Sequence, residues 1–562
     1  EPYRRQRQMC IRDSVRSETL ETETSLPNFR QGDAIILYER NRDTDNVTNK
    51  MVFKGNIEYL TENEIGIRLR ATQQNPSVLP AESLYAIEHD TMDTTFRSMY
   101  QGLYIYLSAR KERRDLLLSQ RPPRFDESLD SMISRSEDDF TRIALKAKAA
   151  QDYFLLIGPP GTGKTSCALK KMVETFHADK DAQILLLSYT NRAVDEICKS
   201  LASIAPAVDF IRVGSELSCD EAYRGHLIEN ELSSCNRRSE VYERIRNCRI
   251  IVGTVAAISG KPELFRLKHF DVAIIDEATQ ILEPQLLGIL CARGEDGKDA
   301  IDKFVLIGDH KQLPAVVQQN TEQSAIYDES LLSIGLTNLK DSLFERLYRN
   351  CTATVHRSYD MLCRQGRMHP EVALFANRAF YGGRLIPVGL PHQIESSDTI
   401  CRLAFYPSVP EKAGASAKIN YSEARIVADL AVRIYEDHQT DFDESRTLGI
   451  ITPYRSQIAL IKKEIESLGI PALNRILVDT VERFQGSERD VIIYSFCVNY
   501  PYQLKFLSNL TEEEGVLIDR KLNVALTRAR KQMFITGVPE LLERNPLYKS
   551  LLKLIESLRN IA

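Results

Sequence analysis

Long hydrophobic runs, paired cysteines and a secretory leader pattern are all missing from this sequence of 562 residues. No run of eighteen apolar residues occurs, which argues against a membrane-spanning helix. The start of the chain also lacks the charged, then apolar, then small-residue order of a signal peptide. The 11 cysteines include no Cys-x-x-Cys pair and no histidine at ligand spacing. A structural metal is therefore not expected, and reduced thiols in a cytoplasmic protein are the better interpretation.

The net charge does not indicate a class of ligand, because the 73 Lys and Arg residues and the 78 Asp and Glu residues nearly balance and give a formal charge of −5. Binding clefts are local, so this balance neither demands nor forbids nucleic acid. A chain of this length is too long for one core, and three or four domains are expected. Residues 1–14 are arginine-rich and patternless and are interpreted as a cloning or assembly scar, with native sequence expected to be missing before residue 15.

The hydrophobic period changes along the chain and predicts four regions. Short alternating segments separated by polar turns predict a small antiparallel β-barrel over 15–90. Apolar residues at helical spacing predict a stalk of one or two helices over 91–125. Residues 126–354 and 355–562 each alternate short apolar strands with helical segments, which is the pattern of a parallel sheet covered on both faces. The expected fold class is α/β, with two such domains in tandem after the barrel and stalk.

The first of these α/β domains contains a phosphate-binding loop. An apolar strand ends at Gly158, and the loop leads through Gly161, Gly163, Lys164 and Thr165 into a helix. Glycines without Cβ atoms let backbone N–H groups surround a triphosphate at a helix N-terminus. The lysine would reach the β and γ phosphates, and the threonine hydroxyl would bind Mg²⁺. The sequence thus predicts ATP and Mg²⁺ as cofactors.

Two later strand ends carry polar residues suited to hydrolysis. Asp276 and Glu277 follow an apolar strand, at the edge where α/β sheets bind ligands. The aspartate suits the Mg²⁺ shell and the glutamate suits the activation of water. Gln312 lies just after the next strand and can donate to phosphate and accept from water. His310 in the same loop is interpreted as an ordinary loop residue.

These residues together resemble the superfamily 1 helicases, and six motifs appear in family order over some 400 residues. The closest likeness is to the 1B branch, which includes the nonsense-mediated decay helicase and the replication nuclease-helicase. That likeness implies two RecA-like domains preceded by an accessory barrel and stalk. The later motifs are the segments 308–314, 365–370, 452–455, 478–488 and 522–530.

The resemblance implies a role for each matching residue. Arg367 and Arg528 of the second domain would reach the γ-phosphate as arginine fingers, and Glu488 would contact the ribose or the γ-phosphate network. Catalysis is thereby assigned to these arginines with Lys164, Glu277 and Gln312. A further set, at the ends of strands in both domains, would hold the phosphates of a nucleic-acid strand: Thr190, Asn191, Gly253, Thr254, Thr452, Tyr454, Arg455 and Thr480.

Two positions depart from the family pattern. Phe140 stands where an adenine-reading glutamine is usual, and Gly366 replaces the aromatic residue of the Gln-Tyr-Arg element. The sequence therefore provides no obvious adenine-reading side chain.

The function expected from these features is ATP-driven translocation and unwinding, 5′ to 3′, on single-stranded DNA or RNA. Two alternatives remain open. One is a nucleic-acid clamp or scaffold in which ATP only times release. The other is the motor half of a longer nuclease-helicase, with a nuclease domain or partner upstream, since no nuclease carboxylate set is evident in these 562 residues.

Overall fold

The computed structural model describes most of the chain, and the predicted scar at 1–14 lies outside the described residues. The chain divides into two compact units, residues 1–97 and 98–562. The described residues are 29, 32–61, 64–71, 75–90, 94–317, 319–354, 356–395, 400–411, 417–513 and 515–559.

The first unit contains a four-stranded antiparallel sheet in the order β3-β2-β1-β4. Ile35, Tyr38 and Ile57 are its buried apolar residues, and because Ile35 and Tyr38 are three positions apart in one strand they point to opposite faces of the sheet. The predicted antiparallel region is confirmed as this sheet. Its alternating pattern suggested two short strands around residues 51–60, but β2 is one continuous strand there. Its strands are β1 (Ala34–Glu39), β2 (Val52–Leu60), β3 (Ile65–Leu69) and β4 (Tyr85–His89).

The predicted stalk is a pair of helices, α2 (Thr94–Ser108) and α3 (Lys111–Leu117). A Cβ built on Gly102 would lie 2.2 Å from the carbonyl oxygen of Pro284, so α2 lies against the helix that contains Pro284 with its backbone in close approach. In α3 the buried Arg113 donates to the carbonyl of Ile301 at 2.5 Å. The stalk is therefore packed on the first α/β domain.

The first α/β domain has a seven-stranded parallel sheet in the order β11-β5-β10-β9-β6-β8-β7. The alternate residues of β5 enter two hydrophobic cores, one on each face, which explains why the strands read as continuous apolar runs. The strands are β5 (Tyr153–Ile157), β6 (Ile184–Ser188), β7 (Phe210–Val213), β8 (Ile250–Thr254), β9 (Phe270–Ile275), β10 (Ile301–Gly308) and β11 (Tyr359–Met361).

Two strands of this sheet were not expected from the sequence. β7 is only four residues long, and β11 pairs with β5 although it follows residue 354. The first sheet thus includes a strand from beyond the predicted boundary between the two domains.

The second α/β domain has a five-stranded parallel sheet in the order β14-β20-β17-β15-β16. It too is covered on both faces, because alternate residues of β17 enter different cores. β14 had no counterpart among the predicted strands. The strands are β14 (Leu403–Pro407), β15 (Leu448–Ile451), β16 (Leu477–Asp479), β17 (Arg489–Ser495) and β20 (Ala529–Gly537).

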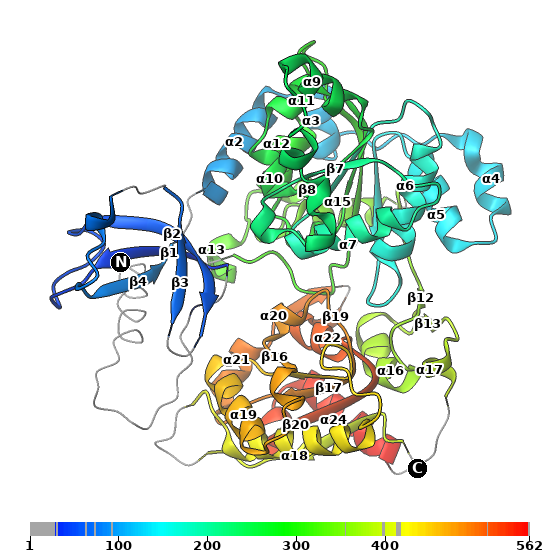
Figure 1. Ribbon diagram of the computed structural model, residues 1–562. Helices are drawn as coiled ribbons and strands as arrows, with labels where there is room; N and C mark the ends of the chain where they lie inside the picture. The colour runs from blue at the N-terminus through cyan, green and yellow to red at the C-terminus, as the bar shows by residue number, and fades with distance from the viewer. Residues whose placement is uncertain are drawn as a thin grey trace. The chain divides into compact units, whose positions relative to one another are not determined.

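Figure 1 shows helices on both sides of each parallel sheet, and the prediction of two RecA-like α/β domains is confirmed. None of the helices in the described ranges is long and apolar enough to cross a membrane. The longer helices are α5 (Asp139–Ala149), α6 (Lys170–His177), α7 (Asn191–Ala202), α9 (Arg238–Asn247), α12 (Glu283–Leu290), α15 (Leu343–Ala353), α16 (Pro370–Phe380), α18 (Tyr421–Asp437), α19 (Arg455–Ser467), α22 (Arg520–Leu526) and α24 (Pro546–Arg559). The shorter ones are α4 (Asp130–Arg135), α8 (Ile228–Glu231), α10 (Val255–Ser259), α11 (Glu263–Leu267), α13 (Thr321–Ser324), α14 (Glu329–Ser333), α17 (Pro391–Ile394), α20 (Val481–Phe484), α21 (Leu504–Leu507) and α23 (Pro539–Leu542).

Candidate functional site

The glycine-rich loop follows β5 and enters a helix whose first segment, η3 (Lys164–Leu169), is π-helical. Gly161 and Gly163 have φ values of +74° and +77°, in the left-handed region that favours glycine. A Cβ on Gly158 would lie 2.0 Å from the Cγ of Lys164, so the loop closes around the lysine side chain. The backbone N–H groups of such a loop at a helix N-terminus can hold phosphate oxygens.

Asp276 and Glu277 lie at the end of β9, next to this loop. The hydroxyl of Thr165 donates to Asp276 Oδ2 at 2.5 Å, and Lys164 Nζ lies 3.6 Å from Glu277 Oε1. Burial, and then the adjacent Glu277, raises the pKa of Asp276 to about 6. A buried carboxylate beside a hydroxyl is a set of oxygen ligands that fits Mg²⁺, and the ion's charge would offset the cost of burying that carboxylate.

The backbone of Glu277 is in a strained conformation. Its φ is +53°, which is uncommon outside glycine, asparagine and aspartate. Strain of this kind gathers at functional sites because the surrounding structure must hold it. The turn places the Glu277 carboxylate beside Lys164. Activation of water by this carboxylate stays a prediction.

Gln312 joins the two α/β domains through Arg528. The Nε2 of Gln312 donates to Asp309 Oδ2 at 2.8 Å, and its Oε1 accepts from a guanidinium nitrogen of Arg528 at 3.2 Å. Arg528 is 2% exposed, and burial, followed by the nearby Arg367, lowers its pKa to about 9. Because the guanidinium of Arg528 is buried and close to that of Arg367, the two groups favour the binding of an anion between the domains.

Arg367 lies directly against the glycine-rich loop. A Cβ on Gly161 would lie 2.5 Å from the Arg367 Cβ, and the N–H of Gly366 donates to the Gly161 carbonyl at 2.8 Å. The Nε of Arg367 donates to Glu488 Oε2 at 2.5 Å. The structure thus places Glu488 as a carboxylate that orients Arg367, and a contact with ribose stays a prediction.

A buried tyrosine that the sequence analysis missed bridges the same domains. The hydroxyl of Tyr381, just after α16, donates to Asp309 Oδ2 at 2.7 Å and accepts from Asn523 Nδ2 at 2.8 Å. Asn523 also donates to the carbonyl of Lys311 at 2.7 Å. Burial, and then Asp309, raises the pKa of Tyr381, so the phenol stays protonated and keeps donating. Only the adjacent Gly-Gly turn marks this position in the sequence.

Charged side chains also connect the two α/β domains. Glu513, in the hairpin of β18 (Leu510–Glu513) and β19 (Val516–Asp519), lies 3.0 Å from His310 and 3.4 Å from Lys311. Burial raises the pKa of Glu513, but the hydrogen bonds and positive charge of His310 and Lys311 together outweigh it and lower the pKa to about 2. Arg520 pairs with the buried Glu345 at 2.5 Å. His310, expected to be an ordinary loop residue, is therefore part of the contact between the domains.

The predicted nucleic-acid residues fall into two groups. In the first domain they follow β6 or end β8, where Thr190 and Thr254 accept hydrogen bonds from backbone N–H groups and cap α7 and α10. Asn191 begins α7. A Cβ on Gly253 would lie 3.0 Å from the Val213 carbonyl, so packing alone already favours glycine there.

In the second domain the predicted residues follow the neighbouring strands β15 and β16. Thr452 is fully buried, and its hydroxyl has no hydrogen-bond partner within the described residues. The hydroxyl of Tyr454 accepts from Gln503 at 3.2 Å, Arg455 begins α19 and Thr480 immediately precedes α20. Each group thus lies at the carboxyl edge of its own sheet.

The comparisons with known proteins cover both α/β domains. One family model described as an AAA domain matches residues 135–241 and 228–320, and a second of the same description matches 339–540. The DNA replication ATP-dependent helicase/nuclease JHS1 of Arabidopsis thaliana is 28% identical over 97% of this chain and 40% of its own length. The helicase/nuclease DNA2 of Bos taurus is 27% identical over 95% of this chain and 50% of its own length. These matches bear out the resemblance to the superfamily 1 helicases, and the chain is similar to Dna2-like helicase/nucleases over both α/β domains.

The chain spans about half the length of these two relatives. The DNA polymerase alpha-associated DNA helicase A of Saccharomyces cerevisiae is 24% identical over 82% of the chain and 73% of its own length. The likeness to the first two relatives covers both α/β domains and the residues before them.

The two positions that depart from the family pattern lie at the glycine-rich loop. Phe140 lies on α5, and a Cβ on Gly163 would lie 3.5 Å from its ring. Gly366 is the residue whose N–H reaches the Gly161 carbonyl. Neither provides a polar side chain for the adenine edge.

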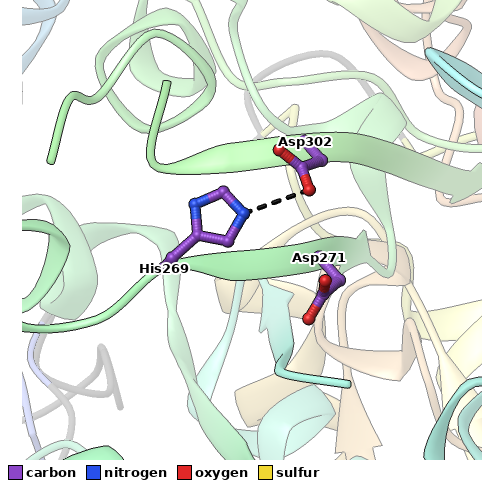
Figure 2. Close-up of side chains that lie close together, drawn as sticks. All are labelled: His269, Asp271 and Asp302. Carbon is purple, nitrogen blue, oxygen red and sulfur yellow. Dashed lines mark ion pairs between the residues drawn. The ribbon is translucent and has the colours of Figure 1, made fainter. Parts of the chain in front are cut away.

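A separate cluster lies at the amino-terminal ends of β9 and β10. His269, Asp271 and Asp302 are the one group of three His, Cys, Asp or Glu side chains in the described ranges that could hold a metal ion, and their ligand atoms lie within 4.8 Å of one another (Figure 2). His269 Nε2 is 3.0 Å from Asp302 Oδ2, and Asp271 Oδ2 accepts from the Gln183 N–H at 2.6 Å. These contacts explain the cluster as a surface ion pair at the sheet edge opposite Asp276.

Proposed function

We propose that this chain is an ATP-driven motor that moves along single-stranded nucleic acid and separates strands. The observation that carries the proposal is the hydrogen bond between the buried Arg528 of the second domain and Gln312 of the first. A site completed by both domains makes hydrolysis depend on their closure. Hydrolysis can then change the distance between two groups that hold the same strand.

The chemistry follows from the side chains around the glycine-rich loop. Backbone N–H groups and Lys164 would bind the phosphates, while Thr165 and Asp276 would hold Mg²⁺, which supplies charge neutralisation at the β and γ oxygens. Glu277 would orient and polarise the attacking water. Arg528 and Arg367 would stabilise the negative charge that spreads over the phosphoryl oxygens in a loose transition state.

The track would lie across the predicted residues at the two carboxyl edges. Hydroxyl and backbone donors there can hold phosphates without reading bases. ATP binding would draw the two groups together and release would separate them, which advances the motor when each group grips in turn. Travel from 5′ to 3′ is part of the proposal and rests on the likeness to the 1B branch.

The decisive test is a strand-displacement assay on duplexes with a 5′ or a 3′ single-stranded tail, made from DNA and from RNA. We expect ATP-dependent displacement from the 5′ tail and ATPase stimulation by the preferred strand. Glu277→Gln is the matched control, since it should bind ATP without turnover. Stimulated hydrolysis without displacement from either tail would favour an ATP-timed clamp, and displacement from the 3′ tail alone would contradict the polarity.

A second candidate is the motor part of a nuclease-helicase. It is favoured by one observation: the two relatives named helicase/nuclease extend well beyond the matched region. A nuclease assay on the intact natural protein, with Lys164→Ala to silence the motor, would separate the two activities. DNA is the track expected in that case. The ten described cysteines are free thiols, which supports a reducing cytoplasmic setting as part of the proposal.

A further inference from the structure

Three aromatic side chains gather on the loop that follows β17, outside every motif described above. Tyr502 and Phe506 are 54% and 70% exposed, and Tyr500 is half-buried. The rings of Tyr500 and Tyr502 are 5.8 Å apart between centroids and 16° from parallel. The Phe506 ring stands edge-on to Tyr502 at 6.5 Å. We call Tyr500, Tyr502 and Phe506 the aromatic platform.

The platform is mounted on a fixed loop. The buried Gln503 accepts from the N–H groups of Asn499 and Tyr500, each at 2.9 Å, and donates to the Ala417 carbonyl at 2.7 Å. The intervening Leu504 is buried in the core of the second domain. Two large rings thus stay exposed although the residues between them are anchored, so their exposure does not come from a loose segment.

The chain enters this loop through a strained residue. Cys497 is buried and has a φ of +50°, an uncommon value for a residue other than glycine. Because such strain must be held by its surroundings, it marks segments that are kept in a particular shape. Here the strained residue turns the chain from β17 toward the platform.

The platform lies at the same edge as the predicted track residues of the second domain. β17 pairs in parallel with β15, with Tyr494 opposite Ile451, so the segments after both strands leave the sheet side by side. Gln503 confirms this closeness because it donates to the hydroxyl of Tyr454 at 3.2 Å. The exposed Lys505, between Leu504 and Phe506, adds a positive charge beside the rings.

We infer that the aromatic platform stacks the bases of the single strand whose phosphates the Thr452 to Arg455 segment holds. This inference rests on the proposed function and adds a base contact to a surface otherwise made of phosphate contacts. Every base has a π-face, so stacking holds a strand without reading its sequence, and each stacked base is typically worth about 1–3 kcal/mol. That energy corresponds to about 5–150-fold in affinity.

The test compares an oligothymidylate with an abasic strand of equal length, using fluorescence anisotropy on the full chain. We expect the wild type to bind the oligothymidylate about 5–150-fold more tightly than the abasic strand. The double variant Tyr502→Leu, Phe506→Leu keeps apolar bulk but removes the π-faces. It should lose most of that ratio while its affinity for the abasic strand stays within about twofold.

Two matched variants control the measurement. Tyr502→Phe retains the π-face and should retain the ratio, and Tyr104→Leu changes an exposed tyrosine on α2 and should leave the ratio unchanged. A wild-type ratio near one would overturn the inference, as would an equal loss of affinity for both strands in the double variant. A change of oligomeric state in light scattering of the double variant would identify the platform as a protein contact instead and overturn it. Failure of the wild type to bind either strand would refute the proposed function together with the inference.

Discussion

The two parallel sheets of this protein present their candidate functional residues differently. In the first domain the glycine-rich loop, Asp276 and the predicted track residue Thr254 all follow carboxyl ends of strands. In the second domain Glu488 and Arg528 immediately precede β17 and β20, at the amino edge, while Thr452 follows β15 at the carboxyl edge.

This difference indicates a division of labour between similar folds. In the first domain the proposed nucleotide site and the predicted track residues lie at one edge, so under the proposed function this domain would act as a fixed base. The second domain has its arginines at one edge and its track residues at the other, so a rotation that closes the ATP site also moves the grip on the strand. The predictions below test this division, beginning with the largest expected effect.

Changes in the first domain should abolish the chemistry. Lys164→Ala and Glu277→Gln should reduce ATP hydrolysis to background, and Glu277→Gln should still bind ATP because it removes a base and not a phosphate contact. Steady-state hydrolysis and equilibrium binding of a fluorescent ATP analogue measure the two quantities. Turnover near the wild-type rate in Glu277→Gln would refute the assignment of the base.

Substitution of the arginines of the second domain should slow ATP turnover without weakening ATP binding. Arg528→Lys should lower turnover by about 10³-fold, the lower end of what an arginine finger provides, because an ammonium cannot reproduce the guanidinium fork. ATP affinity should stay within about threefold, since the contact forms mainly in the transition state. A variant that loses only affinity would show that Arg528 binds the ground state and would contradict the division of labour.

The tyrosine bridge offers a test of coupling between the domains. Tyr381→Phe removes the hydroxyl that joins Asp309 to Asn523 and leaves both with one partner fewer, a loss of about 1–3 kcal/mol. We expect strand-stimulated ATP turnover to fall about tenfold, with nucleotide affinity unchanged.

A matched control exists inside the second domain. Tyr548 is equally buried and donates to Asp519 at 2.9 Å, so Tyr548→Phe removes a similar hydrogen bond that does not cross between the domains. Both variants should lose similar stability, but only Tyr381→Phe should lose stimulated turnover. Equal turnover in the two variants would remove Tyr381 from the coupling.

The buried carboxylates of the two domains should differ in their dependence on pH. Asp276 is the proposed Mg²⁺ ligand, whereas Glu423 is fully buried in the second domain and accepts from Ser495 at 2.6 Å and from the N–H of Cys497 at 2.8 Å. Burial raises the pKa of Glu423 from 4.5 to about 7. Protonation of Glu423 therefore stabilises the folded state. This stabilisation is complete below about pH 4.5 and is lost as the pH rises through about 7.

Glu423→Gln removes this titration. The free energy of unfolding of the variant relative to the wild type should rise by about 2–3 kcal/mol between pH 5 and pH 8. Urea unfolding at the two pH values, followed by near-UV circular dichroism, provides the measurement. A difference between variant and wild type that does not change with pH would show that Glu423 stays ionised when buried.

The smallest expected effect concerns the base of the nucleotide. Phe140 and Gly366 leave phosphate and metal contacts as the main source of affinity, so kcat/KM for ATP and GTP should differ by less than about tenfold, the size of one modest stacking contact. Competition kinetics with the two nucleotides checks this. A hundredfold preference for ATP would show that another side chain reads adenine.

The sequence by itself determined the α/β class, the glycine-rich loop and the order of the motifs. Those features depend on local spacing: continuous apolar strands, glycines where a loop must take a positive φ, and polar residues just after a strand. Asp276 and Gln312 could therefore be located without a structure. The antiparallel sheet before them also follows from its alternating period.

Tertiary structure alone decided which distant residues meet. Tyr381 and Asp309 are 72 positions apart and look like ordinary loop residues until burial places one hydroxyl between two domains. β11 is too short to be recognised as a strand, and it joins the first sheet only because it pairs with β5. The exposure of Tyr502 and Phe506 is likewise invisible in the sequence, where aromatic residues predict a core. Local sequence patterns indicate which secondary structure and motifs a segment can form, whereas long-range packing determines which residues the segment contacts.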